Sequence, residues 1–132
     1  MVKYALIKGE MVMYYRIGEF SKMVGLPTST LRYYDDIGIL KPSRIDRFTD
    51  YRMYSDTDYD KAMVIKELLS LSFTLEEVLA CKDNITSDMI QYKIDELKTR
   101  INELQDQINR LESMNKTKSS NKVLQIEQRR VA

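Results

Sequence analysis

From residue 17 onward, apolar residues recur at the spacing that places them on one face of a helix. Ile17, Phe20 and Val24 recur at intervals of three and four, which predicts a short amphipathic helix over about residues 18–24. Gly25 follows directly, and glycine readily adopts the left-handed conformation that ends a helix.

A second helix is predicted over about residues 28–37. Pro27 is tolerated at its start, because the first turn of a helix has no internal partner for a backbone donor. Gly38 is placed to close this helix. Three apolar residues share one face of it and are predicted to pack in the core: Leu31, Tyr34 and Ile37.

The chain then changes to an extended pattern. Pro42 forbids a continuing helix, and Tyr51–Tyr54 alternates aromatic and polar residues as a strand does. Two short helices joined by a glycine turn and followed by a hairpin form a winged helix-turn-helix. The second helix of such a unit enters the major groove, so this pattern predicts a DNA-binding domain.

Polar caps mark three further helices. Ser55-Asp56 begins the first, and Thr74-Leu75-Glu76-Glu77 is a capping box that opens a short helix to about Lys82. Thr86 begins the last and longest helix. The chain is therefore predicted to be mainly α-helical.

The last helix carries a heptad pattern. Its a and d positions are apolar without a break: Ile94, Ile101 and Ile108 at a, and Ile90, Leu97, Leu104 and Leu111 at d. Such a seam must be buried against another helix. Packing onto its own domain is the alternative, but the strict pattern favours a partner chain. Residues 85–115 are therefore predicted to be a coiled-coil dimerisation helix.

Two features bear on the orientation of the paired helices. Isoleucine at a with leucine at d is the preference of parallel dimers. Parallel pairing, however, would set Lys93 against Lys98 of the partner helix, which is a like-charge contact. The charges thus weakly favour the antiparallel arrangement while the a and d residues favour the parallel one, and the heptad pattern by itself leaves both open.

Residues 1–13 precede these elements and are predicted to be an N-terminal extension. One interpretation is an ordinary strand over residues 2–7. The other is a misassigned start, with translation beginning at Met11 or Met13. Lys8-Gly9-Glu10 fits the second interpretation, because its codons can spell a purine-rich ribosome-binding sequence.

Composition mainly argues against certain functions, namely metal binding, catalysis and membrane insertion. A length of 132 residues suits one small domain with an extension, and a net charge of +1 does not by itself suggest nucleic acid. Histidine is absent and Cys81 is the single cysteine, so no metal site and no cofactor are predicted. No catalytic pair stands out, and an enzyme is not expected. Without a membrane-spanning run or a signal-peptide pattern, a cytoplasmic, nucleoid-associated protein is expected.

Three blocks follow one another in order: Ile17–Leu26, Leu31-Arg32-Tyr33-Tyr34-Asp35, and Asp50–Ser55. Together they resemble the DNA-binding domain of MerR-type bacterial transcription regulators, and the similarity runs from Tyr14 to Cys81. Three blocks in the right order and spacing are more specific than a lone helix-turn-helix. The resemblance implies a winged helix-turn-helix domain over residues 14–84, followed by an antiparallel coiled-coil dimerisation helix.

The resemblance also implies which residues contact DNA. On the recognition helix these are Thr28, Ser29, Arg32 and Tyr33. On the wing they are Arg44, Tyr51 and Arg52. Many family members carry arginine where Ser29 stands and glycine where Asp50 stands. Aspartate tolerates tight turns, so the wing turn is expected to survive.

Members of this family bind a pseudo-palindromic promoter as homodimers and distort its spacer so that RNA polymerase can engage it. The resemblance implies the same function here. Residues 116–132 are predicted to be a polar linker followed by a strand. That strand resembles the first strand of the gyrase-inhibitor-like effector domain of multidrug-type members, with a frayed basic tail as the alternative. A small-molecule effector is expected only if a further domain exists.

Two other functions were weighed. A metal-responsive short member of the family would need cysteines beyond the dimerisation helix, and none follows Cys81. A coiled-coil adaptor protein without sequence-specific DNA binding belongs to a different class. A mobility-shift assay separates the adaptor from a regulator, because an adaptor gives no specific shift.

Overall fold

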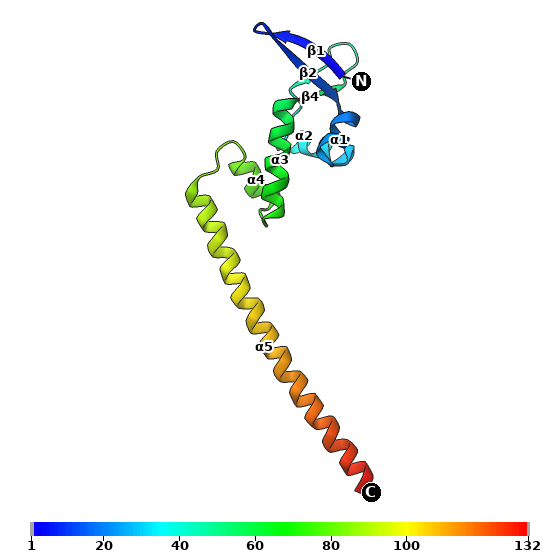
Figure 1. Ribbon diagram of the computed structural model, residues 1–132, viewed down its shortest axis with the longest axis vertical. Coiled ribbons are helices and arrows are strands. Elements are labelled where there is room, and N and C mark those ends of the chain that lie inside the picture. The colour runs from blue at the N-terminus through cyan, green and yellow to red at the C-terminus, as the bar shows by residue number, and fades with distance from the viewer. Residues whose placement is uncertain (1, 132) are drawn as a thin grey trace. The chain divides into compact units, whose positions relative to one another are not determined.

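The computed structural model describes the backbone of residues 2–131 and the side chains of residues 4–120. Met1 and Ala132 lie outside the described residues. The chain divides into two units, Met1–Ile85 and Thr86–Ala132. The first unit holds a four-stranded sheet and helices α1–α4, and the second is formed by the helix α5 (Figure 1).

The sheet of the first unit is antiparallel and has the strand order β1-β2-β4-β3. Its strands are β1 (Val2–Ile7), β2 (Glu10–Arg16), β3 (Arg44–Ile45) and β4 (Arg52–Ser55). Strand β4 lies between β2 and β3, so the wing formed by β3 and β4 is a direct extension of the central sheet. The β1–β2 turn and the β3–β4 loop lie at opposite ends of the sheet (Figure 1).

Strands β1 and β2 form a hairpin with the two-residue turn Lys8-Gly9. Both turn residues have positive φ, 52° and 81°, as a type I′ hairpin turn requires. The structure therefore has the strand that one of the two interpretations of the N-terminus expects. Because β2 crosses residue 14, the expectation of a separate extension over residues 1–13 is corrected. A translation start at Met11 or Met13 stays a prediction.

The helix-turn-helix follows the predicted boundaries closely. Helix α1 spans Ile17–Val24 and helix α2 spans Thr28–Ile37. Gly25 and Gly38 end these helices in the left-handed conformation, with φ of 70° and 83°. The side chain of Lys66 also donates to the last carbonyl of α1, with 2.7 Å between Nζ and the oxygen of Val24.

Helices α3 (Asp56–Ser70) and α4 (Leu75–Cys81) both begin with a capping box. In α4, Glu77 N donates to Thr74 Oγ1 at 3.1 Å and Thr74 N donates to Glu77 Oε1 at 2.9 Å. These contacts confirm the starts predicted for both helices.

The core of the first unit joins the helices to the wing strand. Phe20 of α1 and Tyr54 of β4 are fully buried, and their rings stack with 4.3 Å between centroids. Leu31 and Tyr34 of α2 are buried in the same cluster, which confirms the predicted core role of Tyr34. Burial raises the pKa of Tyr54 to about 12, so its phenol stays neutral beneath the wing.

Asp58 fastens the segment before the wing to helix α3. Its buried Oδ2 accepts hydrogen bonds from Ser43 N at 2.9 Å, Ser43 Oγ at 2.6 Å and Ser55 N at 2.9 Å. A buried carboxylate with three donors is satisfied, whereas removing it takes the charged acceptor away from the backbone N–H groups of Ser43 and Ser55. Asp58 therefore ties both ends of the wing hairpin to one helix.

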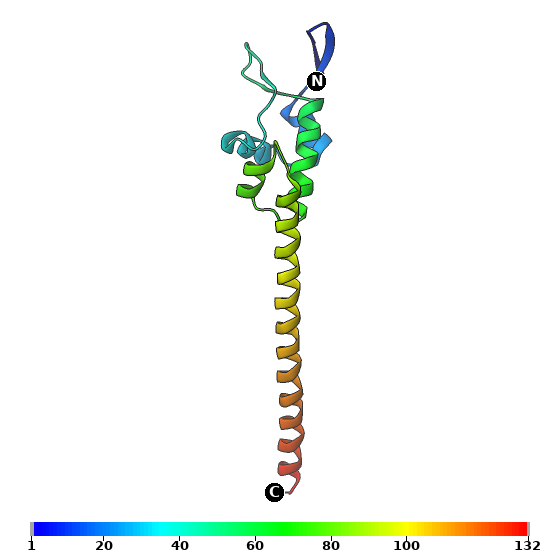
Figure 2. The ribbon, with the colours of Figure 1, turned by 90° about the vertical axis from the view of Figure 1, so that its left-hand side faces the viewer.

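Helix α5 runs without interruption over Ser87–Val131 (Figure 2). Its start after Thr86 was predicted, and Met89 N donates to Thr86 Oγ1 at 3.2 Å. The linker and strand predicted over residues 116–132 are wrong, because the described backbone stays helical to Val131. The physical reason is that no glycine or proline follows Pro42, and the segment is rich in lysine and glutamine, which favour helix.

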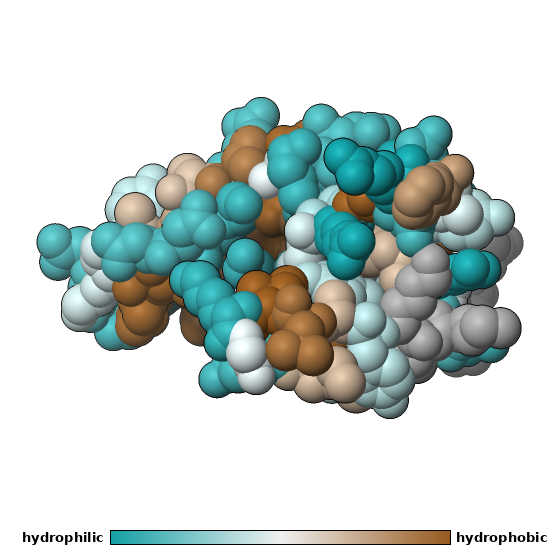
Figure 3. Space-filling model, turned by 90° about the horizontal axis from the view of Figure 1, so that it is seen from above, coloured by the Kyte–Doolittle hydropathy of each residue, from teal (hydrophilic) through white to brown (hydrophobic). Residues whose placement is uncertain are grey.

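Within the described residues, none of the helices combines the length and the apolar character that crossing a membrane requires. Hydrophobic surface seen from above is broken into patches among hydrophilic side chains (Figure 3). The exposed large hydrophobic residues of the β1–β2 hairpin are Tyr4, Leu6, Ile7 and Met11.

We expect Asp58→Ala to lower the free energy of unfolding by about 2–3 kcal/mol, because three donors around it lose a charged acceptor. Urea denaturation followed by circular dichroism measures the change. Asp60→Ala is the matched control, since Asp60 is exposed on the same helix, and should change stability by less than about 0.5 kcal/mol. Equal effects of the two substitutions would contradict the role assigned to Asp58.

Candidate DNA-binding surface

The outer face of α2 presents polar side chains on a helix whose opposite face is buried. Ser29, Arg32 and Tyr33 are exposed, and Thr28 is half-buried at the start of the helix. The first turn of α2 contains no acidic residue and its cap has no side-chain hydrogen bond. The backbone N–H groups of this turn and the positive end of the helix dipole are therefore available to an anion such as a phosphate.

The wing ends in a loop held by its own hydrogen bonds. Asp46 N donates to the carbonyl of Tyr51 at 2.8 Å, and Asp50 N donates to the carbonyl of Asp46 at 2.9 Å. Asp50 has a φ of 59°, a conformation that glycine adopts most easily and aspartate tolerates. The wing turn thus forms with aspartate at this position, as predicted.

An open groove of about 330 Å³ lies where α1, α2 and the wing meet. It is lined by Arg16, Ile17, Gly18, Glu19, Arg32, Asp50, Tyr51 and Arg52. Three of the predicted contact residues, Arg32, Tyr51 and Arg52, therefore come together. The lining holds three guanidinium groups, those of Arg16, Arg32 and Arg52, and two carboxylates, those of Glu19 and Asp50, so it carries one more positive than negative charge.

Arg16 is the groove residue that the sequence pattern did not single out. Its guanidinium carbon lies 4.6 Å from the centroid of the Tyr51 ring, a cation–π distance. Pairing of β2 with β4 places Arg16 opposite Met53 and brings it beside the wing. The only sequence signal was a basic residue immediately before the first helix, which is weak without knowledge of that pairing.

Arg52 links the wing to the recognition helix. Its Nε donates to Asp35 Oδ2 at 2.8 Å, and this hydrogen bond is the main cause that raises the pKa of Arg52 above its usual range. Lys41 Nζ lies 3.6 Å from the other oxygen of Asp35. Arg52 therefore holds the wing against α2, and its remaining donors are left for a phosphate.

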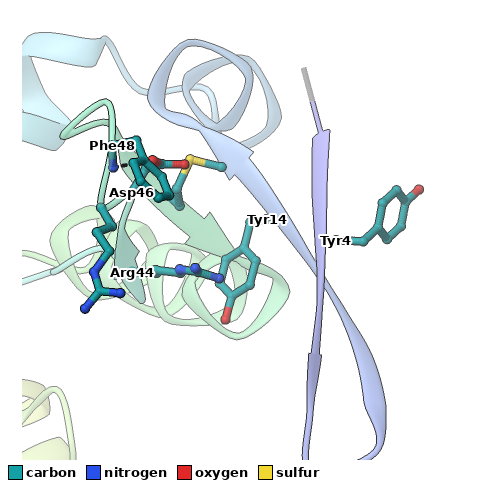
Figure 4. A pocket seen from close by; sticks show the side chains of 7 residues that line it. Tyr4, Tyr14, Arg44, Asp46 and Phe48 are labelled. Atoms are coloured by element: carbon teal, nitrogen blue, oxygen red, sulfur yellow. Dashed lines mark hydrogen bonds between the residues drawn. The ribbon is translucent and has the colours of Figure 1, made fainter.

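Arg44 lies apart from this groove. Its guanidinium carbon is 5.8 Å from the centroid of the Tyr14 ring, over a separate hollow of about 360 Å³ (Figure 4). That hollow is lined by Tyr4, Tyr14, Arg44, Asp46, Arg47, Phe48 and Met53. The structure thus places Arg44 and Arg32 in separate hollows, although both were predicted to contact DNA.

Residues 15–80 match the family model described as MerR HTH family regulatory protein. The chain belongs to this family. The match agrees with the similarity expected from Tyr14 to Cys81, and it spans both α1 and α2.

Several MerR-family relatives share the sequence. The chain is 40% identical over 70 residues to the multidrug-efflux transporter 1 regulator of Bacillus subtilis (strain 168), covering 53% of this chain and 25% of that protein. It is 33% identical over 103 residues to the mercuric resistance operon regulatory protein of Bacillus cereus, covering 65% and 76%. The chain therefore spans about a quarter of the first relative and about three quarters of the second.

A solved structure shares the fold of this MerR-family chain. The cryo-EM structure of an EcmrR–DNA complex in EcmrR-RPo superposes with a TM-score of 0.71 at 30% identity. The match covers 80% of this chain and 40% of that chain. The two relatives found by sequence are named as a regulator and a regulatory protein. Among the described residues, no group of three or more cysteine or carboxylate side chains is placed to hold a metal ion.

We expect the Asp35–Arg52 pair to stabilise the wing against α2 by about 0.5–1 kcal/mol, as partly exposed ion pairs do. A double-mutant cycle with Asp35→Ala and Arg52→Ala measures this coupling by urea denaturation. The matched control cycle replaces Asp36, which is exposed on the same helix, and should show coupling of less than about 0.3 kcal/mol. Equal coupling in both cycles would mean that the pair does not position the wing.

Proposed function

We propose that this MerR-family chain is a DNA-binding transcriptional regulator. It binds a pseudo-palindromic promoter as a homodimer and distorts the promoter spacer to control transcription. The observation that carries the proposal is the groove in which Arg32 of α2 meets Arg16, Tyr51 and Arg52. Recognition helix and wing are thereby built into one surface.

On this surface each side chain has a separate role. Arg32 projects from the exposed face of α2, where a guanidinium can contact two acceptors on a guanine edge or bind a phosphate. Tyr33 lies beside it, and Thr28 and Ser29 sit at the helix start, where hydroxyls and backbone N–H groups bind phosphate. Arg16 contributes a further charge for the DNA backbone at the wing.

The surface suits a polyanion because several acidic side chains near it are paired within the protein, not because the chain has a large excess of basic residues. Asp35 is paired with Arg52 and lies near Lys41, so its charge is offset within the protein. The carboxylate of Asp46 accepts backbone N–H groups of the wing loop at 2.9 and 3.2 Å. Asp50 is exposed and stays a repulsive group, which lowers affinity for phosphate nearby.

The apolar seam of α5 supports a dimer. Most of its side chains are exposed on the single chain, and Ile101 and Leu111 each have 64% of their surface accessible. A continuous apolar stripe at a and d positions is buried when a second helix packs on it. We propose that a second copy of α5 does so in the antiparallel orientation, which also avoids the Lys93–Lys98 contact of a parallel pair.

Dimerisation gives the DNA surface its second half-site. Two linked recognition helices turn the second contact into an intramolecular event and raise affinity without new contacts. Distortion of the spacer costs energy that depends on the sequence deformed, and the contacts of both domains offset it. RNA polymerase at the promoter is the proposed further partner, and a small-molecule effector is proposed only where a further domain exists.

We expect Arg32→Ala to abolish specific DNA binding while the fold and the dimer persist. One lost guanidinium contact costs about 1–3 kcal/mol in each subunit, which is up to roughly 100-fold per half-site. The probe is a duplex that the unmodified chain selects from a random-sequence pool, assayed by mobility shift. Arg110→Ala is the matched control, because Arg110 is an exposed arginine on α5 outside the seam. Unchanged affinity of the Arg32 variant would refute the DNA-binding surface.

We expect Ile101→Asp to convert the dimer to a monomer, because it places a charge from both chains in an apolar seam. Sedimentation equilibrium measures the mass, and the same duplex reports the weaker binding of a single half-site. Asn102→Asp adds the same charge one residue away at an outward heptad position and should leave the dimer intact. A dimer that survives Ile101→Asp would show that the interface lies elsewhere.

A further inference from the structure

Phe48 stands at the tip of the wing loop with 92% of its surface exposed, the largest value among the large hydrophobic residues described. A single exposed apolar side chain is ordinary on a protein surface. Its setting, however, is not: the loop that carries it is closed by backbone hydrogen bonds, places Arg47 next to Phe48, and contributes Asp50 and Tyr51 to the proposed DNA groove.

The loop holds Phe48 in a defined place. Asp46 Oδ1 accepts hydrogen bonds from Phe48 N at 2.9 Å and from Thr49 N at 3.2 Å, and the first of these lies within the cluster drawn in Figure 4. The base of the loop is closed by the Asp46–Tyr51 backbone contact at 2.8 Å. The aromatic ring is therefore presented by a preorganised turn, which lowers the entropy lost when it binds.

The charges beside Phe48 fit a nucleic-acid partner. Arg44 and Arg47 are exposed on the same hairpin and line the same hollow as Phe48. The acidic residue of this hollow, Asp46, is held by the loop backbone. An apolar side chain beside basic residues is an arrangement with which minor-groove proteins insert a wedge between base steps while binding the adjacent phosphates.

The number of residues between Tyr51 and Phe48 bounds how far the tip of the loop can lie from the proposed DNA groove. Tyr51 lines the groove that contains Arg32, and Phe48 precedes Tyr51 by three residues. Three residues span at most about 10 Å, whereas half the width of the major groove is about 6 Å. With Arg32 in the major groove, this upper bound permits the tip of the loop to reach the flanking phosphates and the edge of the neighbouring minor groove.

We propose that Phe48 is a wedge that enters the minor groove of duplex DNA and partly unstacks one base step. This inference rests on the proposed function and names how part of the distortion is produced. Flexible pyrimidine–purine steps are the preferred site, because they unstack at the lowest cost. Two wedges in a dimer act on the two sides of the promoter site.

The test uses the full chain and a duplex that the unmodified chain selects from a random-sequence pool. Fluorophores at the two duplex ends report bending by energy transfer, and 2-aminopurine at each pyrimidine–purine step reports unstacking by increased fluorescence. Phe48→Ala removes the wedge, and Phe48→Leu keeps an apolar one. Arg47→Ala serves as the control for a phosphate contact.

We expect Phe48→Ala to reduce both the bend and the 2-aminopurine signal by at least roughly half, while affinity changes by no more than about tenfold. The affinity change is small because the unstacking cost disappears together with the contacts of the ring. Phe48→Leu should keep most of both signals. Arg47→Ala should reduce the slope of log affinity against log salt by about one, whereas Phe48→Ala should leave that slope unchanged.

Two results for Phe48→Ala would overturn the proposal of a wedge. The first is a complex with unchanged bend and unchanged 2-aminopurine signal. The second is a salt slope that falls as it does for Arg47→Ala, while the unstacking signal is retained. The second result would show that Phe48 only orients a phosphate-binding loop. If the unmodified chain selects no duplex, the DNA-binding proposal itself fails. That outcome is distinct from a chain that binds DNA and bends it without Phe48.

Discussion

The stacked pair of Phe20 and Tyr54 is the contact on which the arrangement of the first unit depends. Tyr54 comes from the central wing strand and Phe20 from the first helix of the helix-turn-helix, and both are fully buried. Because α2 packs its own apolar face into the same cluster, one core sets the position of wing and recognition helix together. The elements that line the groove therefore share one core.

Around this core, polar contacts fix the position of the wing hairpin relative to α2 and α3. Asp58 fastens both ends of the wing hairpin to α3, and the Arg52–Asp35 pair joins the wing to α2. Each acidic residue engaged in this way also ceases to be a free negative charge. Arg16, Arg32 and Arg52 line the groove together with Glu19 and Asp50, which leaves it an excess of one positive charge in a chain whose net charge is +1.

The two units divide the proposed function between them. The first carries the DNA contacts, including a wing loop that presents Phe48 rigidly. The second carries an apolar seam on α5, and its pairing with a second copy supplies the other half-site. In the proposed dimer, affinity, register and distortion depend on both protomers, because each protomer alone offers half of the contacts with the duplex.

The sequence by itself determined features that depend on neighbouring residues. Helix ends at Gly25 and Gly38 and the capping box at Thr74 were predicted because caps involve residues a few positions apart. The continuation of α5 was missed, since polar residues do not end a helix without glycine or proline. The tertiary structure alone decided that Arg52 meets Asp35, that Arg16 joins the groove and that Arg44 lies in a separate hollow. Strand pairing and packing bring distant residues together, and no local pattern encodes those distances.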